Sequence, residues 1–145
     1  MPGFHTQVRM AKFDYKDFQH TVNMNGIVVA DIGKAVTWDN SEDNAVKLAG
    51  DGDPICGVIY TVEDRVNEGQ LIGTIEMKFA AYLPIKAGLT GAKAVARGKK
   101  LCGAGGGEVR AIDVTPTTGD VALTAQNGHP HCWGLFAGKA IGQLI

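Results

Sequence analysis

Residues 33–59 read GKAVTWDNSEDNAVKLAGDGDPICGVI, and this stretch decides the fold because the chain repeats its plan over residues 98–136. Both stretches open on glycine and lysine, continue with apolar residues and reach a polar or glycine-rich turn. A second apolar run follows the turn, and each stretch closes on a cysteine followed by glycine and apolar residues. Two apolar runs around a turn are typical of a β-hairpin. The sequence therefore predicts a duplicated unit made of a hairpin and a strand, able to form one barrel or sandwich.

The two copies differ in length. Gly33 to Gly57 spans 24 residues and Gly98 to Gly134 spans 36, so the second copy carries an insert of about 12. We expect this insert, within Val114–Gly128, to form a projecting loop or a weak extra hairpin, since long loops in compact domains are usually functional or mobile.

Composition favours a β-rich chain. The protein has 145 residues, enough for one domain, and 20 of them are glycines that separate short apolar runs. We predict an all-β fold: a small β-barrel or β-sandwich built from the duplicated hairpin unit, with at most one short helix. The expected organisation is an extended N-terminal arm over residues 1–25 and a single β domain over residues 26–145.

Several local expectations follow from the residue pattern. Ile27–Ala30 and Leu71–Ala80 are predicted strands, the second ended by Pro84. Ala87–Arg97 is the most helix-like piece, and its glycines limit it to a turn or two. Trp133–Ile145 is expected to be a closing strand.

The arm is unusually apolar. Three of the five phenylalanines lie in residues 1–25, which is typical of a segment that anchors on another chain. An edge strand folded onto its own core is the alternative. The candidate partner-binding residues are Phe4, His5, Arg9, Phe13, Tyr15 and Phe18.

Charge is balanced overall but divided along the chain. The net charge of −1 gives no general attraction to nucleic acid or membrane, and no apolar run is long enough for a membrane span. Residues 31–76 hold ten acidic and three basic side chains, whereas residues 78–110 hold seven basic and one acidic. Such a division either joins neighbouring copies through complementary faces or forms two solvated faces.

The cysteines and the start of the chain indicate a cytosolic product. Cys56, Cys102 and Cys132 form neither a CxxC pair nor an even framework, so we expect reduced, small apolar side chains. The first residues hold no apolar signal-peptide segment.

The strongest candidate for chemistry is His129-Pro130-His131-Cys132. On a strand the two histidines would share a side, as zinc ligands do, but further ligands at ordinary spacing are missing, which favours a polar start to a strand. Cys132 and His131 would point to opposite faces, so they cannot serve as nucleophile and base. We expect no catalytic residues, no metal and no cofactor.

Two other patterns have more than one interpretation. Residues 103–107, GAGGG, lack the context of a phosphate-binding loop, and a hairpin turn is favoured. The aromatic residues Trp38, Tyr60, Tyr82 and Trp133 are either stacking platforms of a carbohydrate- or receptor-binding module or, as we favour, barrel core. A small hydrolase using His129, His131 and Cys132 is a third, weaker hypothesis.

The repeated sequence pattern resembles that of the head decoration, or capsid cement, proteins of tailed bacteriophages. The residues that carry the resemblance lie within Ile27–Ile145: Gly33–Asp39, Cys56–Val58, Asn67–Gly69, Phe79–Pro84 and Gly98–Leu101. The resemblance implies a small β-barrel or sandwich that binds the outer surface of an assembled head and reinforces it by bridging major capsid protein subunits. It further implies a virion protein made in the host cytoplasm and acting as a symmetric homo-oligomer, dimer or trimer. The aromatic arm is longer than the short polar leader expected in that family.

Overall fold

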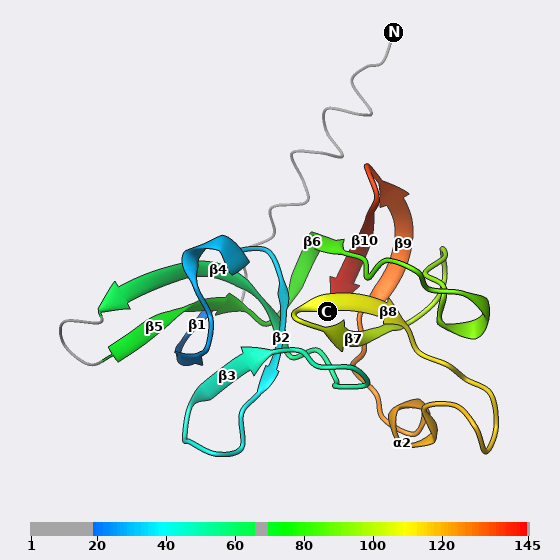
Figure 1. Ribbon diagram of the computed structural model, residues 1–145, viewed down its shortest axis with the longest axis horizontal. Helices are drawn as coiled ribbons and strands as arrows, with labels where there is room; N and C mark the ends of the chain where they lie inside the picture. The colour runs from blue at the N-terminus through cyan, green and yellow to red at the C-terminus, as the bar shows by residue number, and fades with distance from the viewer. Residues whose placement is uncertain (1–18, 66–69, 145) are drawn as a thin grey trace, which may run out of the picture.

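The computed structural model describes residues 19–65 and 70–144, which form short strands and tight turns (Figure 1). The predicted all-β fold, with a closed barrel and one short helix, is confirmed. The elements are β1 (Gln19–Asn25), the 3₁₀ turn η1 (Val29–Asp31), β2 (Ala35–Trp38), β3 (Ala45–Leu48), β4 (Gly57–Arg65), β5 (Gln70–Glu76), β6 (Phe79–Pro84), the 3₁₀ turn η3 (Gly91–Lys93), β7 (Leu101–Gly105), β8 (Glu108–Ala111), α2 (Val121–Thr124), β9 (His131–Phe136) and β10 (Lys139–Leu144).

Strands β1 to β5 close into a first ring in the order β1-β3-β2-β4-β5. Strand β1 runs parallel to β3 and antiparallel to β5, and the other neighbours are antiparallel. Val22 and Met24 of β1 are buried inside this ring. The predicted boundary of the arm at residue 25 is therefore wrong, because residues 19–25 are a barrel strand with core side chains. Residues 1–18 lie outside the described part.

Strands β6 to β10 repeat this arrangement. Hydrogen bonds join β6-β10-β9 into one sheet and β7-β8 into another. Two single bridges link these sheets: Ile85 with Val109, which is parallel, and Lys100 with His131, which is antiparallel. The resulting order is β6-β8-β7-β9-β10, with the same strand directions as in the first ring. The duplicated hairpin is thus confirmed as β2-β3 and β7-β8, but the repeating unit is five strands, and each copy forms a ring of its own.

The glycine-rich turn of the β7-β8 hairpin joins the two rings. It lies against β2 (Figure 1), where the backbone N–H of Ala35 donates to the carbonyl of Gly107 at 2.9 Å. The N–H of Gly107 donates in turn to the carbonyl of Ala49 at 3.1 Å. A Cβ on Gly103 would lie 2.8 Å from the Ala49 Cβ, so only glycine allows this approach. The prediction of a hairpin turn at residues 103–107 is confirmed.

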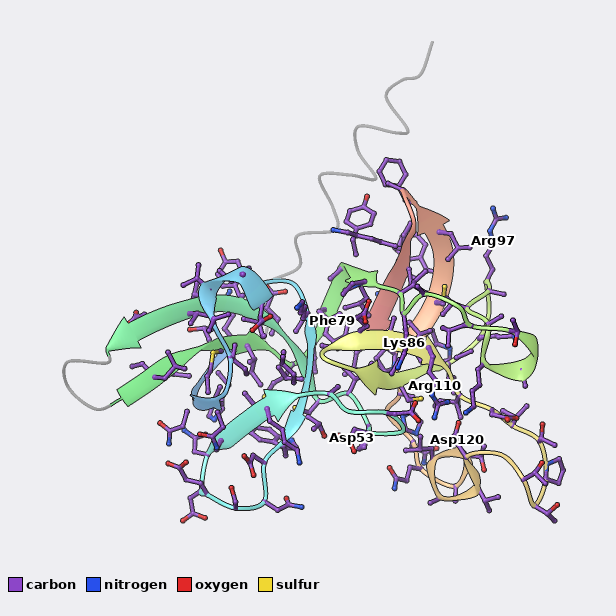
Figure 2. The ribbon with its side chains drawn as sticks, in the orientation of Figure 1. Asp53, Phe79, Lys86, Arg97, Arg110 and Asp120 are labelled. Atoms are coloured by element: carbon purple, nitrogen blue, oxygen red, sulfur yellow. The ribbon has the colours of Figure 1, made fainter. Side chains whose placement is uncertain are left out.

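One apolar core continues across the junction. Phe79 lies between the rings in Figure 2 and is fully buried. Its core cluster takes residues from both copies: Ala35, Ala49, Ile55, Val58, Phe79, Leu83, Leu101, Val109, Cys132 and Ala140. Shared close packing of this kind makes the two rings one stiff body.

Three predicted elements differ from the structure. Residues 27–30 are not a strand: only Ile27 is buried, and the Asp31 carboxylate accepts a hydrogen bond from the Val28 N–H at 3.0 Å and bends the chain into η1. The predicted strand at 71–80 is the end of β5 and the start of β6, because the chain changes rings between Glu76 and Phe79.

The third difference lies in the second copy. Residues 133–144 form two strands rather than one, since Ala137 and Gly138 take positive φ values of 50° and 75° and turn the chain back. Two expectations for this copy are confirmed: the helix-like stretch at 87–97 is limited to the single turn η3, and the insert is a loop, which holds the single turn of α2.

Candidate functional site

The sheet β6-β10-β9 has an apolar side that faces away from the core, here called the outer face. Cross-strand pairing brings Tyr82 beside Ile141 and Ile141 beside Gly134. The Tyr82 and Phe136 rings contact each other, with centroids 5.6 Å apart and planes inclined at 45°. The opposite side of the same strands carries Leu83 and other residues of the shared core. Side chains of one strand thus divide between core and surface.

Large apolar side chains gather on β9 and remain exposed. Trp133, Leu135 and Phe136 are 43%, 49% and 46% exposed. Trp38, on β2, is 39% exposed. The expectation that the tryptophans fill a barrel is therefore wrong, because the interiors are packed with aliphatic residues and Phe79. Phe136 and Tyr82 adjoin on the outer face, whereas Leu135 pairs with the core residue Ala140 and lies on the other side of the sheet. Exposed apolar side chains of this size are typical of a protein-binding surface.

The His-Pro-His-Cys motif does not assemble into a reactive group. His129 is buried, and its Nε2 lies 2.9 Å from the carbonyl oxygen of Leu123 in α2. His131 is exposed on β9, whereas Cys132 is buried in the shared core. The opposite orientation predicted for these two neighbours is borne out. His129 instead ties the insert to β9.

Two hollows adjoin at this point, with Lys100 and His129 lining both. The first has a volume of about 410 Å³ and is lined by Ala92, Gly98, Lys99, Lys100, Ile112, Val114, Leu123, Thr124, Gln126 and His129. The second has a volume of about 390 Å³ and is lined by Lys100, Gly128, His129, His131, Trp133, Gln143 and Leu144. The first hollow therefore has an apolar floor and basic side chains, and the second has a tryptophan beside polar groups.

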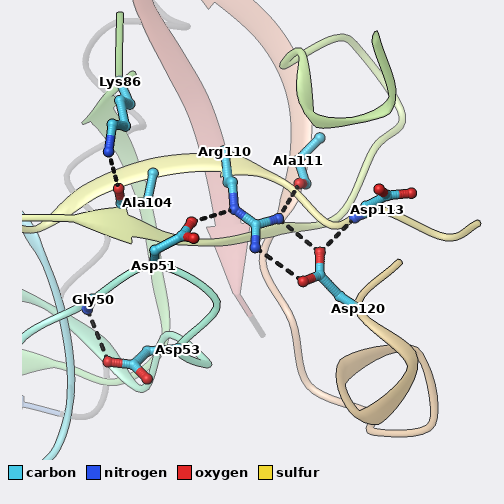
Figure 3. Close-up of polar contacts among 9 residues, drawn as sticks. All are labelled: Gly50, Asp51, Asp53, Lys86, Ala104, Arg110, Ala111, Asp113 and Asp120. Carbon is cyan, nitrogen blue, oxygen red and sulfur yellow. Dashed lines mark hydrogen bonds and ion pairs between the residues drawn. The ribbon is translucent and has the colours of Figure 1, made fainter. Parts of the chain in front are cut away.

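Arg110, on β8, is a buried cation at the centre of an ionic cluster (Figure 3). The Arg110 side chain is 3% exposed; its Nε donates to Asp51 at 2.7 Å, and its two terminal nitrogens donate to Asp120 at 2.7 and 2.9 Å. Asp120 also accepts from the Asp113 N–H at 2.8 Å. The guanidinium thus joins the turn after β3, strand β8 and the insert. No sequence pattern indicated this cluster, because Asp51 lies 59 residues away from Arg110.

Electrostatics fix the charge states of this cluster. The hydrogen bonds from Arg110 lower the pKa of Asp120 to about 2, against the opposing effect of burial. The same guanidinium lowers the pKa of Asp51, and the carboxylates raise the pKa of Arg110. All three groups stay ionised at neutral pH, so the cluster is a structural clamp that moves no proton there.

Two of the three cysteine thiols are poor nucleophiles. Burial raises the pKa of Cys56 and of Cys102 to about 12 in each case. Because the thiolate is the reactive form, these side chains behave as small apolar residues. All three cysteines are free, as the sequence predicted.

The predicted partner-binding residues, Phe4 to Phe18, lie outside the described residues. Within residues 19–65 and 70–144, no three His, Cys, Asp or Glu side chains gather as a metal site would require. No helix in that part of the chain is long and apolar enough to cross a membrane. No family model, curated protein or solved structure matches this chain.

Proposed function

We propose that this protein is a structural decoration, or cement, protein that binds the outer surface of an assembled bacteriophage head. In this role it bridges neighbouring major capsid protein subunits and stabilises the shell. The observation that carries the proposal is the exposed apolar surface around β9: Phe136 lies against Tyr82 on the outer face, and Trp133 and Leu135 are further exposed anchors on the same strand.

The physical requirements of such a protein agree with the fold. A cement protein needs stiffness and binding surfaces rather than a cleft, and the two rings share one core. A ligand that binds only the assembled lattice stabilises that lattice by mass action. A symmetric shell presents the same modest interface many times. When several copies are linked in one oligomer, binding of the first copy raises the effective concentration of the others at the shell.

The N-terminal arm is the second contact in this proposal. Its anchors are the predicted residues Phe4, His5, Arg9, Phe13, Tyr15 and Phe18, directed to the coat protein or to the next decoration subunit. A deletion that tests the arm has to end at residue 18, because β1 begins at Gln19. Loss of head binding on removing residues 1–18 would support this part, and unaltered occupancy would contradict it.

Co-sedimentation with purified heads of the encoding phage tests the outer face. We expect wild-type protein to pellet with heads in a saturable manner and Phe136→Ser to bind at least tenfold more weakly. Val121→Ser is the matched control, since Val121 is similarly exposed but lies on α2, away from β9. Equal binding by both variants would refute the assignment of this face.

A carbohydrate- or receptor-binding module is the second candidate, favoured by one observation. Trp133 lines the 390 Å³ hollow together with Lys100, His131 and Gln143, and an exposed indole beside polar groups suits sugar stacking. Glycan-array binding that is lost in Trp133→Ala, without binding to heads, would favour this function over shell decoration.

A further inference from the structure

The duplication gives each ring the same backbone groove. In the first ring the groove lies between Ala35, at the start of β2, and Ala49, just after β3; the Ala49 N–H donates to the Ala35 carbonyl at 3.1 Å. In the second ring it lies between Lys100, just before β7, and Ile112, just after β8; the Ile112 N–H donates to the Lys100 carbonyl at 2.9 Å. We call these the first and second grooves.

The first groove already holds a hairpin turn. The turn of β7-β8 enters it, and Gly107 both accepts from Ala35 and donates to Ala49. A Cβ on Gly107 would come within 2.8 Å of the Lys34 Cβ, so the fit is close. The element bound in the first groove is therefore the turn between the second and third strands of the other copy of the repeat.

The second groove is only partly filled. The insert places Leu123 against Ile112 and Cys102, and the first hollow, about 410 Å³, remains beside it. Lys99 and Lys100 line this hollow. The Lys99 Nζ donates to the Ala94 carbonyl at 3.1 Å, and Lys100 is exposed. The opening is therefore apolar at its floor and basic at its rim.

The element equivalent to the β7-β8 turn in the first ring is the β2-β3 turn, residues 39–44. This turn is exposed and acidic, with Glu42 and Asp43 at its tip, and it lies far from α2 in Figure 1. Hydrogen bonds within the turn and to β1 hold its shape: the Asp39 carboxylate accepts from the Ser41 N–H at 2.9 Å, and Asn44 Nδ2 donates to the Thr21 carbonyl at 3.0 Å. A preformed turn loses little conformational entropy when it binds.

We propose that the second groove of one molecule binds the β2-β3 turn of a second molecule of this chain. The turn takes the place that the β7-β8 turn takes in the first groove, but its contact is made by charge: Asn44 stands where Gly107 stands, and the Asn44 carbonyl already accepts from the Asn23 N–H at 2.8 Å. Glu42 and Asp43 meet Lys99 and Lys100, and the turn backbone covers the apolar floor. Because the two surfaces differ, the contact is head-to-tail and generates a ring or an open chain. This self-association stands whether or not the protein decorates a shell.

Charge reversal and mixing test this contact by sedimentation velocity at low ionic strength. Wild-type protein is expected to associate with rising concentration and to dissociate as salt screens the charges. The variants Glu42→Lys/Asp43→Lys and Lys100→Glu are each expected to raise the dissociation constant at least tenfold. An equimolar mixture of the two variants pairs opposite charges again and is expected to recover association.

Lys139→Glu is the control, since Lys139 is an exposed lysine on β10 outside both hollows, and it should associate like the wild type. Circular dichroism checks that every variant is folded. A monomeric wild type throughout the concentration series, or a mixture in which the two folded variants remain separate, would overturn the proposal. Association that is equally strong in both reversal variants would also overturn it.

Discussion

Replacing Arg110 with alanine tests the clamp that ties the insert to both rings. The side chain is 3% exposed, and its loss removes three hydrogen bonds to carboxylates. The Asp120 side chain, 18% exposed, is then left without its cation, whereas Asp51, 62% exposed, regains water. Breaking a buried ion pair from one side costs about 3–5 kcal/mol. We expect Arg110→Ala to lower the free energy of unfolding by about 3 kcal/mol, because one of the two carboxylates is solvated.

Urea denaturation with a constant m-value measures this loss, and a thermal midpoint about 10 °C lower should accompany it. Asp51→Asn is the matched control, with an expected loss below about 1 kcal/mol, as for an exposed ion pair. Asp120→Asn should fall between the two. If Arg110→Ala loses no more stability than Asp51→Asn, the cluster is not a clamp and the reasoning fails.

The pH dependence of stability in acid tests the same cluster independently. The pKa of Asp120 is about 2 in the folded protein and near 3.8 when unfolded, so the unfolded chain binds the proton more readily. The stabilisation that ionised Asp120 contributes is complete above about pH 4 and is lost as the pH falls toward 2. A pKa shift of this size corresponds to about 2 kcal/mol in the free energy of unfolding. The slope of stability against pH in this window should be smaller in Asp120→Asn, and an equal slope would contradict the assignment.

Three further predictions concern packing and boundaries. Gly103→Ala should cost about 2 kcal/mol by urea denaturation, since its Cβ would meet Ala49 across the ring junction and the Gly50 carbonyl. Cys56 and Cys102 should fail to react with a thiol reagent at pH 8 until denaturant is added; rapid labelling of the native protein would contradict their raised pKa values. Removing residues 1–18 should leave a cooperative unfolding transition, whereas removing residues 1–25 should abolish it, because β1 supplies Val22 and Met24 to the first core.

Periodicity predicted the parts of the fold that depend on local pattern. The hairpins β2-β3 and β7-β8 follow from apolar runs separated by turn residues, and the glycine run at 103–107 is a hairpin turn for the same reason. The boundary between β5 and β6 was missed because apolar alternation continues through Met77 and Lys78 while the chain changes rings. Alternation records which residues are buried but carries no information about which core receives them.

The surfaces were harder to predict than the strands. Trp133 was predicted as a core residue, but it is 43% exposed on β9, a strand that pairs with β10 alone in its sheet. The bond between His129 and Leu123 and the Arg110 cluster are contacts between distant segments, which a single sequence does not reveal. The doubled ring itself depends on two isolated bridges, Ile85 with Val109 and Lys100 with His131.

The thermal rupture temperature of purified phage heads, measured with increasing amounts of this protein, tests the proposed function most directly. If the protein binds only the assembled shell, the rupture temperature should rise with protein concentration and level off when every site is occupied. The Phe136→Ser variant should need a higher concentration to reach the same plateau. A rupture temperature that does not change at saturating wild-type protein would contradict the account.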